Sequence, residues 1–351
     1  MGLARERENL NATGLPPRVV ATIQAARAHS TRTAYGAKWS VFEEWCLARS
    51  PPVVPFQASV ADILTFLQDR LDLGNAFSTI KVYLAAISAC HLGFDGKTVG
   101  KQPLVCQFIK GALRDHPVSR SLFPTWDLVL VLDSLSRPPF EPLETVELRF
   151  LTFKTVLLVA LTTAKRVSDI HALSVSPECL RFTGDGGKVI FKPNPAFVPK
   201  NHLAVVMPTE LMAFHPPPFA SEEDRGLHCL CPVRALRLYV QRTAARDRPS
   251  QLFVSLGPGS PGKAVSKSTL SRWIVDAIRL AYTSRGAPVP EGLRAHSTRG
   301  VSTSWALCRG VSIQDVCMAA SWSSPSTFAA FYSLDVAATS MAHAVLGVAS
   351  T

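Results

Sequence analysis

Three segments of the chain carry side chains that could break and rejoin a phosphodiester bond. Arg166 directly follows a long apolar stretch, and Tyr332 ends a segment rich in aromatic residues. Between them, His296 and Arg299 stand three positions apart. Arginine suits phosphate binding, because its planar fork donates two hydrogen bonds at once and stays charged. Histidine titrates near neutral pH and could take the proton of a nucleophile.

Each segment also has an ordinary structural interpretation. An arginine at the end of an apolar helix usually extends to solvent, and a His-x-x-Arg pattern arises by chance in many chains. A tyrosine among apolar residues usually belongs to the core, and it becomes a nucleophile only where its proton is accepted and its developing charge is met by arginine. Transfer of a phosphate without a metal needs several donors around the phosphate oxygens. The chemistry therefore depends on the fold bringing the three segments together.

Local spacing already favours part of that arrangement. On a helix, residues three positions apart share a face, so His296 and Arg299 could meet at one phosphate. By the same rule, Asp169 could pair with Arg166 and fix its orientation on the next helical turn.

The elements that must position these residues are predominantly helical. In the first third of the chain, apolar residues recur at helical spacing, and Ser30, Thr31 and Ser59 offer hydroxyl caps at helix starts. Prolines at 51, 52 and 55 end one helix, because proline cannot donate to the helical ladder. The expected helices lie at 19–28, 30–45, 59–67, 78–87 and 105–113. This pattern predicts a small all-helical domain.

A polar, proline-containing stretch at 115–120 marks the expected domain boundary. We expect one domain at residues 1–117 and a larger one at 118–351. Helices of the larger domain are expected at 126–135, 148–163, 233–243, 269–282, 302–307 and 313–320. Two β-rich runs, 188–191 and 203–207, predict a hairpin or small sheet. The predicted fold class is mainly α with a small β-sheet.

Composition narrows the class of partner. The 351 residues suffice for two domains with separate cores, and 37 Lys and Arg against 26 Asp and Glu give a net charge of +11. That excess favours binding to polyanions through counterion release, so nucleic acid is the first partner to consider. No uncharged apolar run is long enough to span a membrane, and we expect no membrane partner.

The eight cysteines are scattered along the chain rather than set in a framework, and we interpret them as reduced, mostly buried thiols of an intracellular protein. The sequence His228-Cys229-Leu230-Cys231 invites a zinc site, but no second ligand pair stands at the spacing of a zinc finger. We therefore expect neither a metal nor a cofactor.

Taken in chain order, these features resemble the tyrosine recombinase family of the phage integrase type. The shared pattern is an arginine followed by Val-Ser-Asp, a β-hairpin with lysines, the His-x-x-Arg, and Trp322 shortly before Tyr332. Segments 30–45 and 78–91 also resemble the family's core-binding domain, so the resemblance covers most of the chain. Stretches 321–328 and 231–236 are most similar to the recombinases of DIRS-type retrotransposons.

The resemblance implies a role for each residue of the pattern. Arg166 and Arg299 would clamp the scissile phosphate, while His296 would accept or share the tyrosine proton. Trp322 would donate its indole N–H to a phosphate oxygen. Tyr332 would attack phosphorus and leave a 3′-phosphotyrosyl bond and a free 5′-hydroxyl.

Two features depart from the bacterial pattern of the family. The first is the length of the hairpin. The family's lysine, which would protonate the leaving hydroxyl, sits in this hairpin and is assigned to Lys200 near its turn, with Lys192 as the competitor. Trp322 also stands ten positions before Tyr332, where the bacterial enzymes usually show nine. This extra residue bears more on the role of Trp322 than on that of the tyrosine.

The resemblance further implies a helical core-binding, SAM-like DNA-binding domain at 1–117 and a catalytic domain at 118–351. The expected activity is site-specific recombination of double-stranded DNA by a homotetramer on two duplexes, serving retrotransposon integration in the nucleus. Two alternatives stay open: a type IB-like topoisomerase that uses the same phosphotyrosine chemistry, and a catalytically inactive DNA-binding protein derived from a mobile element.

Overall fold

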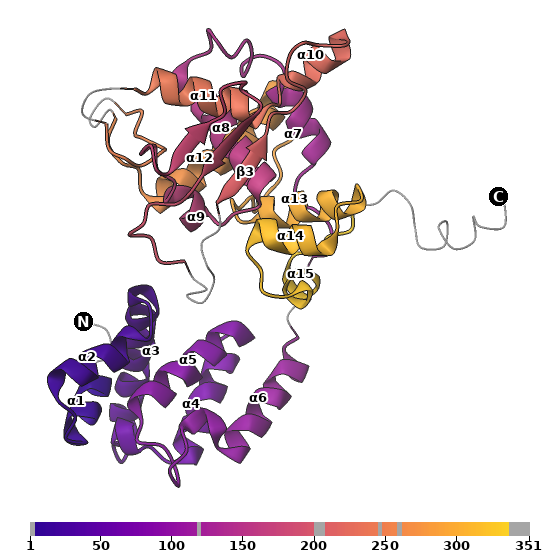
Figure 1. Ribbon diagram of the computed structural model, residues 1–351. Coiled ribbons are helices and arrows are strands. Elements are labelled where there is room, and N and C mark those ends of the chain that lie inside the picture. The colour runs from indigo at the N-terminus through magenta and orange to yellow at the C-terminus, as the bar shows by residue number, and fades with distance from the viewer. Residues whose placement is uncertain (1–3, 118–120, 200–207, 245–247, 258–261, 337–351) are drawn as a thin grey trace. The chain divides into compact units, whose positions relative to one another are not determined.

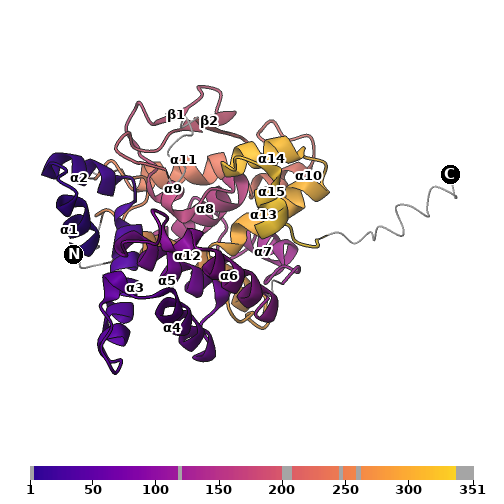
Figure 2. The same ribbon diagram turned by 90° about the horizontal axis from the view of Figure 1, so that it is seen from below.

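The structure is a computed structural model that describes residues 4–117, 121–199, 208–244, 248–257 and 262–336. The chain divides into two compact units, Met1–Arg120 and Ser121–Thr351, both of them mainly helical (Figures 1 and 2). Within the described ranges, no helix combines the length and apolarity needed to cross a membrane.

The first unit is a bundle of helices, as predicted. Its aromatic core joins Phe42, Phe66 and Tyr83, whose rings meet edge to face. Two 3₁₀ turns connect the helices, η1 (Pro55–Gln57) and η2 (Val99–Lys101). The helices are α1 (Ala4–Ala12), α2 (Pro17–Ala25), α3 (His29–Leu47), α4 (Val60–Asp72), α5 (Phe77–Cys90) and α6 (Pro103–Asp115).

Of the helix caps predicted for this unit, one is confirmed and one is wrong. Ser59 caps α4 as expected, in a capping box: its hydroxyl accepts the Asp62 backbone N–H, and the Asp62 carboxylate accepts the Ser59 backbone N–H. The cap expected from Ser30 and Thr31 is wrong, because α3 already begins at His29. Both hydroxyl residues therefore lie inside the first turn, where they cannot serve as the N-cap.

The second unit is built around α8, whose residues are buried along most of its length. Helices α11, α12 and α13 pack against it. This apolar helix spans Leu148–Thr163, as the sequence predicts. The other helices of the unit are α7 (Leu128–Leu135), α9 (Val167–His171), α10 (Glu222–His228), α11 (Pro232–Arg242), α12 (Lys267–Ser284), α13 (Ser297–Cys308), α14 (Ile313–Ala320) and α15 (Pro325–Phe331).

A three-stranded antiparallel sheet with the order β1-β2-β3 completes the second unit. Its strands are β1 (Leu180–Phe182), β2 (Lys188–Phe191) and β3 (Thr209–Met212). The register pairs Arg181 with Ile190 and Val189 with Leu211. The predicted run at 188–191 is thus a strand, and the sequence missed its hairpin partner β1. The run at 203–207 lies outside the described residues.

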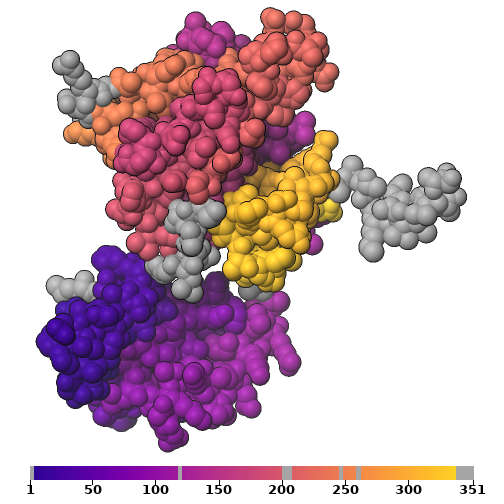
Figure 3. All heavy atoms as spheres, in the orientation of Figure 1, coloured from indigo at the N-terminus to yellow at the C-terminus, as the bar shows by residue number. Residues whose placement is uncertain are grey.

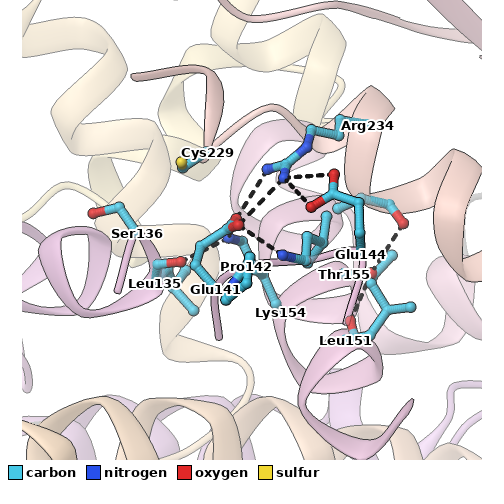
Figure 4. A network of polar contacts seen from close by, with 12 residues as sticks. Leu135, Ser136, Glu141, Pro142, Glu144, Leu151, Lys154, Thr155, Cys229 and Arg234 are labelled. Atoms are coloured by element: carbon cyan, nitrogen blue, oxygen red, sulfur yellow. Dashed lines mark hydrogen bonds and ion pairs between the residues drawn. The ribbon is translucent and has the colours of Figure 1, made fainter. Parts of the chain in front are cut away.

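A buried ionic network ties α8 to its neighbours (Figure 4). Lys154 on α8 is fully buried, donates to the Leu135 carbonyl at 2.7 Å and forms an ion pair with Glu141. Arg234 on α11 donates to Glu141 at 2.9 and 3.2 Å and also binds Glu144. Burial lowers the pKa of Lys154, and the charge of Glu141 opposes that shift. Pairing therefore stabilises four charged groups on and beside the helix that leads to the site.

Candidate active site

The helices α13, α14 and α15 lie side by side at the surface of the second unit (Figures 2 and 3). His296 is the N-cap residue of α13, and Tyr332 directly follows α15. The Tyr332 hydroxyl lies 3.0 Å from Nε2 of His296. This contact suits a neutral imidazole that accepts at Nε2 and carries its proton on Nδ1. The structure therefore places an imidazole nitrogen, which can accept a proton in that tautomer, directly at the tyrosine oxygen.

Arg299 occupies the first turn of α13 and is only 1% exposed. Its guanidinium carbon lies 5.0 Å from the Trp322 ring and 5.2 Å from the Tyr332 ring. Nη2 donates to the Ala320 carbonyl at 2.8 Å, while Nε and Nη1 are buried without a hydrogen-bond partner among the described residues. A buried donor without a partner costs about 1–3 kcal/mol, so these atoms suit an added acceptor.

The electrostatics of Arg299 agree with an anion site. Burial, and next the positive charge of Arg166, lower the pKa of Arg299 to about 10. The guanidinium therefore remains charged at neutral pH but is held at a cost. An incoming phosphate would relieve that cost.

Trp322 contributes a further buried donor to the same region. Its ring lies 4.4 Å from that of Tyr332 at an interplanar angle of 31°. The side chain is buried, and its indole Nε1 has no hydrogen-bond partner within the described ranges. The ten-position spacing between Trp322 and Tyr332 thus still allows their rings to lie in close, tilted contact. Trp322, Arg299 and Tyr332 form one contiguous group.

Arg166 lies on another element, near enough to Arg299 for its charge to lower the pKa of Arg299. Arg166 is the N-cap residue of α9 and follows Ala164, which ends α8 in the left-handed conformation with φ 49°. The Asp169 carboxylate accepts the backbone N–H of Arg166 at 3.1 Å. In the described part of the chain, Asp169 forms no salt bridge with the Arg166 guanidinium, so the expected ion pair is wrong. The carboxylate caps a short helix and leaves the guanidinium available.

The choice between Lys200 and Lys192 as the lysine of the predicted set stays a prediction. Lys200 lies outside the described residues. Lys192 directly follows β2 with an exposed side chain, and its backbone N–H donates to the Cys179 carbonyl at 2.7 Å. Among the described residues, no three His, Cys, Asp or Glu side chains form a group that could hold a metal ion.

Sequence reasoning missed the residues that fix the chain after Tyr332. Ser304 on α13 donates to the Tyr332 carbonyl at 3.2 Å and accepts from the Leu334 amide at 2.9 Å. A Cβ on Gly300 would lie 3.3 Å from the Tyr332 carbonyl oxygen and 3.3 Å from Leu334 Cδ1. Gly300 directly follows Arg299 in the sequence, and a glycine at that place signals a close approach of the backbone.

The assembled group can carry out acyl or phosphoryl transfer to a tyrosine, and phosphate fits its donors best. The hydroxyl of Tyr332 has an acceptor for its proton at His296. Arg299 and Trp322 hold buried N–H groups without partners in the described ranges, and they are suited to the negative charge of a transition state.

Comparison with known proteins bears on the fold. No protein-family model matches the sequence, and no curated protein matches it significantly. The chain is similar to the Tn1549 transposon integrase in complex with transposon right end DNA, with a TM-score of 0.59 and 11% identity over 100% of this chain and 99% of that chain.

Lambda integrase is similar in two solved assemblies. A dimer bound to a COC′ core site matches with a TM-score of 0.51 and 13% identity over 97% of this chain and 98% of that chain. A tetramer bound to a Holliday junction matches with a TM-score of 0.50 and 13% identity over 88% and 74%. The chain therefore has the two-domain fold of the tyrosine recombinases.

Proposed function

We propose that the protein is a site-specific DNA recombinase that cleaves and rejoins strands through a 3′-phosphotyrosyl intermediate. The observation that carries the proposal is the 3.0 Å contact between the Tyr332 hydroxyl and His296 Nε2, beside the buried donors of Arg299. A core tyrosine needs no such surroundings, whereas a nucleophile needs both an acceptor for its proton and cationic donors.

In this reaction the Tyr332 hydroxyl gives its proton to His296 and attacks phosphorus. The bond between phosphorus and the 5′ oxygen breaks, and the 3′ end of the strand stays on the tyrosine. Arg166, Arg299 and Trp322 stabilise the charge on the non-bridging oxygens. A lysine protonates the departing oxygen, for which Lys200 is the first candidate and Lys192 the alternative. Attack by a 5′-hydroxyl on the phosphotyrosyl bond reverses the steps, so rejoining needs no nucleoside triphosphate.

The proposed partner is double-stranded DNA, which the net charge of +11 favours. Similar solved chains include a transposon integrase with transposon end DNA and a lambda integrase tetramer on a Holliday junction. By analogy we propose that residues 1–117 bind DNA and that a homotetramer acts on two duplexes. The similarity of 321–328 and 231–236 to DIRS-type recombinases supports retrotransposon integration, and hence action in the nucleus.

A two-site assay tests this function against its alternatives. Nicked duplexes made from the sequences that flank the coding locus serve as substrates, and a supercoiled plasmid without those sequences serves as the comparison. A recombinase gives a protein–DNA adduct and joined products from two sites. Relaxation of the plasmid without joined products would identify a topoisomerase, and binding without any adduct would identify an inactive DNA-binding protein.

A further inference from the structure

Two loops of the second unit carry Arg166 and Trp322, and both begin with a strained residue. Ala164 ends α8 with φ 49°, and Ser321 ends α14 with φ 54°. The left-handed conformation costs about 1–2 kcal/mol for a residue with a side chain. Such conformations persist where the surrounding structure holds them and are frequent at functional sites.

Lys165 joins these two loops. Its Nζ donates to the Ser321 hydroxyl at 2.8 Å across 156 positions of sequence. Ser321 stands between Ala320, whose carbonyl accepts from Arg299 at 2.8 Å, and Trp322, whose amide donates to the Cys317 carbonyl at 2.9 Å. The turn at 320–322 is thus held by two cationic side chains from different elements.

The placement of Lys165 carries an electrostatic cost. Burial lowers the pKa of Lys165, the carboxylate of Asp169 opposes that shift, and the charges of Arg299 and Arg166 add to it. Lysine also loses about 2 kcal/mol of rotamer entropy when it is fixed. The hydrogen bond to Ser321 thus holds the charged donor at a place that burial and the neighbouring cations disfavour.

We propose that Lys165 is a positioning residue that, through Ser321, holds the turn of Trp322 against the loop of Arg166, so that both side chains address one phosphate. This inference rests on the proposed recombinase function. Lys165 acts on the reaction through Ser321 and is not a ligand of the phosphate. Losing it should therefore slow bond cleavage in the bound complex and leave the affinity for DNA unchanged.

A double-mutant cycle tests the proposal. Lys165→Met and Ser321→Ala should each slow single-turnover cleavage at saturating protein by about 10- to 100-fold, as expected for a displaced catalytic group. The double variant should be no slower than either single variant, because both remove the same contact. Lys267→Met is the matched control: it removes an equal charge from an exposed position at the start of α12 and should cleave at the wild-type rate.

A second measurement does not require cleavage. The indole N–H resonance of Trp322, assigned with Trp322→Phe, should shift in Lys165→Met and in Ser321→Ala by a similar amount, and stay in place in Lys267→Met. Thermal unfolding of each variant identifies any loss of folding. Ser321→Gly serves as a second variant without the hydroxyl, and it relieves the strained φ at this position.

The outcomes separate the two proposals. If the wild-type protein forms no adduct, the proposed recombinase function is refuted. A shared shift of the Trp322 resonance would even then support the positioning contact between Lys165 and Ser321. Additive rate losses, or an unchanged resonance in both variants, overturn the positioning role. A loss of DNA affinity in Lys165→Met with a salt dependence lowered by about one phosphate contact, not reproduced by Ser321→Ala, would make Lys165 a phosphate ligand and also overturn it.

Discussion

The hydroxyl of Tyr332 and Nε2 of His296 lie 3.0 Å apart across 36 positions of sequence. His296 is the N-cap residue of α13, while Tyr332 follows α15, so the contact depends on the packing of α13, α14 and α15 against one another. The buried guanidinium of Arg299 lies against the same tyrosine ring. The arrangement brings an imidazole, a phenol hydroxyl and a guanidinium together at one place. If they act as proposed, the following predictions hold.

Removing a guanidinium should nearly abolish cleavage. Arg299→Ala and Arg166→Ala are each expected to slow single-turnover cleavage by roughly 100- to 1,000-fold, the loss typical of one transition-state donor. Arg309→Ala, which changes an exposed arginine just after α13, is the control and should keep its rate. Near wild-type cleavage by Arg299→Ala would show that this arginine serves structure alone.

The indole N–H of Trp322 should contribute to the rate of cleavage independently of the aromatic ring. Trp322→Phe keeps an aromatic ring beside Tyr332 but removes the unpartnered donor, so cleavage should fall by roughly 100-fold while thermal stability changes little. Trp305→Phe on α13 gives the matched comparison. If both variants cleave equally fast, Trp322 does not donate to the phosphate.

Space at Gly300 should control the position of the nucleophile. The Cβ of Gly300→Ala would lie 3.3 Å from the Tyr332 carbonyl oxygen, so the chain after α15 must shift by a few tenths of an ångström. We expect cleavage to fall by roughly 10-fold at unchanged DNA affinity. Gly226→Ala on α10, where an added Cβ has no neighbour within 4 Å, should cleave normally. Equal rates for the two alanine variants would contradict this account.

The buried ionic network should control stability and its dependence on pH. Glu141→Gln leaves Lys154 charged and without its carboxylate, which should cost about 3–5 kcal/mol of unfolding free energy at pH 7. Burial lowers the pKa of Lys154, so between its folded and unfolded pKa values the folded chain binds fewer protons than the unfolded chain. Stability in that window rises with pH.

Because the carboxylate of Glu141 opposes that shift, its loss lowers the folded pKa of Lys154 further. The destabilisation caused by Glu141→Gln should therefore shrink as pH is raised from 7 towards 10. Urea unfolding of both proteins at several pH values measures it. A difference in unfolding free energy that grows with pH would show that Lys154 is not the group responsible.

Much of the fold could be predicted from the sequence, because helices are specified by patterns among neighbouring residues. The apolar run of α8 and the Ser59 cap of α4 both specify their helices from neighbouring residues alone. Strand β1 has only three residues, fewer than the four over which an alternating pattern marks a strand. Asp169 was assigned to an ion pair because its spacing alone does not distinguish a side-chain contact from a backbone cap.

The site was accessible from the sequence for a different reason. The order of Arg166, His296, Arg299 and Tyr332 resembles a known family, and the structure places the last three in direct contact. Contacts specific to this chain had no such guide. The bond from Lys165 to Ser321 and the approach of Tyr332 to Gly300 depend on tertiary packing that no local pattern contains.

The central claim is that the hydroxyl oxygen of Tyr332 attacks the DNA phosphate, and a nicked suicide substrate tests it most directly. The wild-type chain and Tyr282→Phe should both form a covalent adduct that survives denaturation, with the 3′ end of the DNA on a peptide that contains Tyr332. Tyr332→Phe should bind the same DNA and form no adduct. An adduct formed by Tyr332→Phe would contradict the assignment of Tyr332 as the nucleophile.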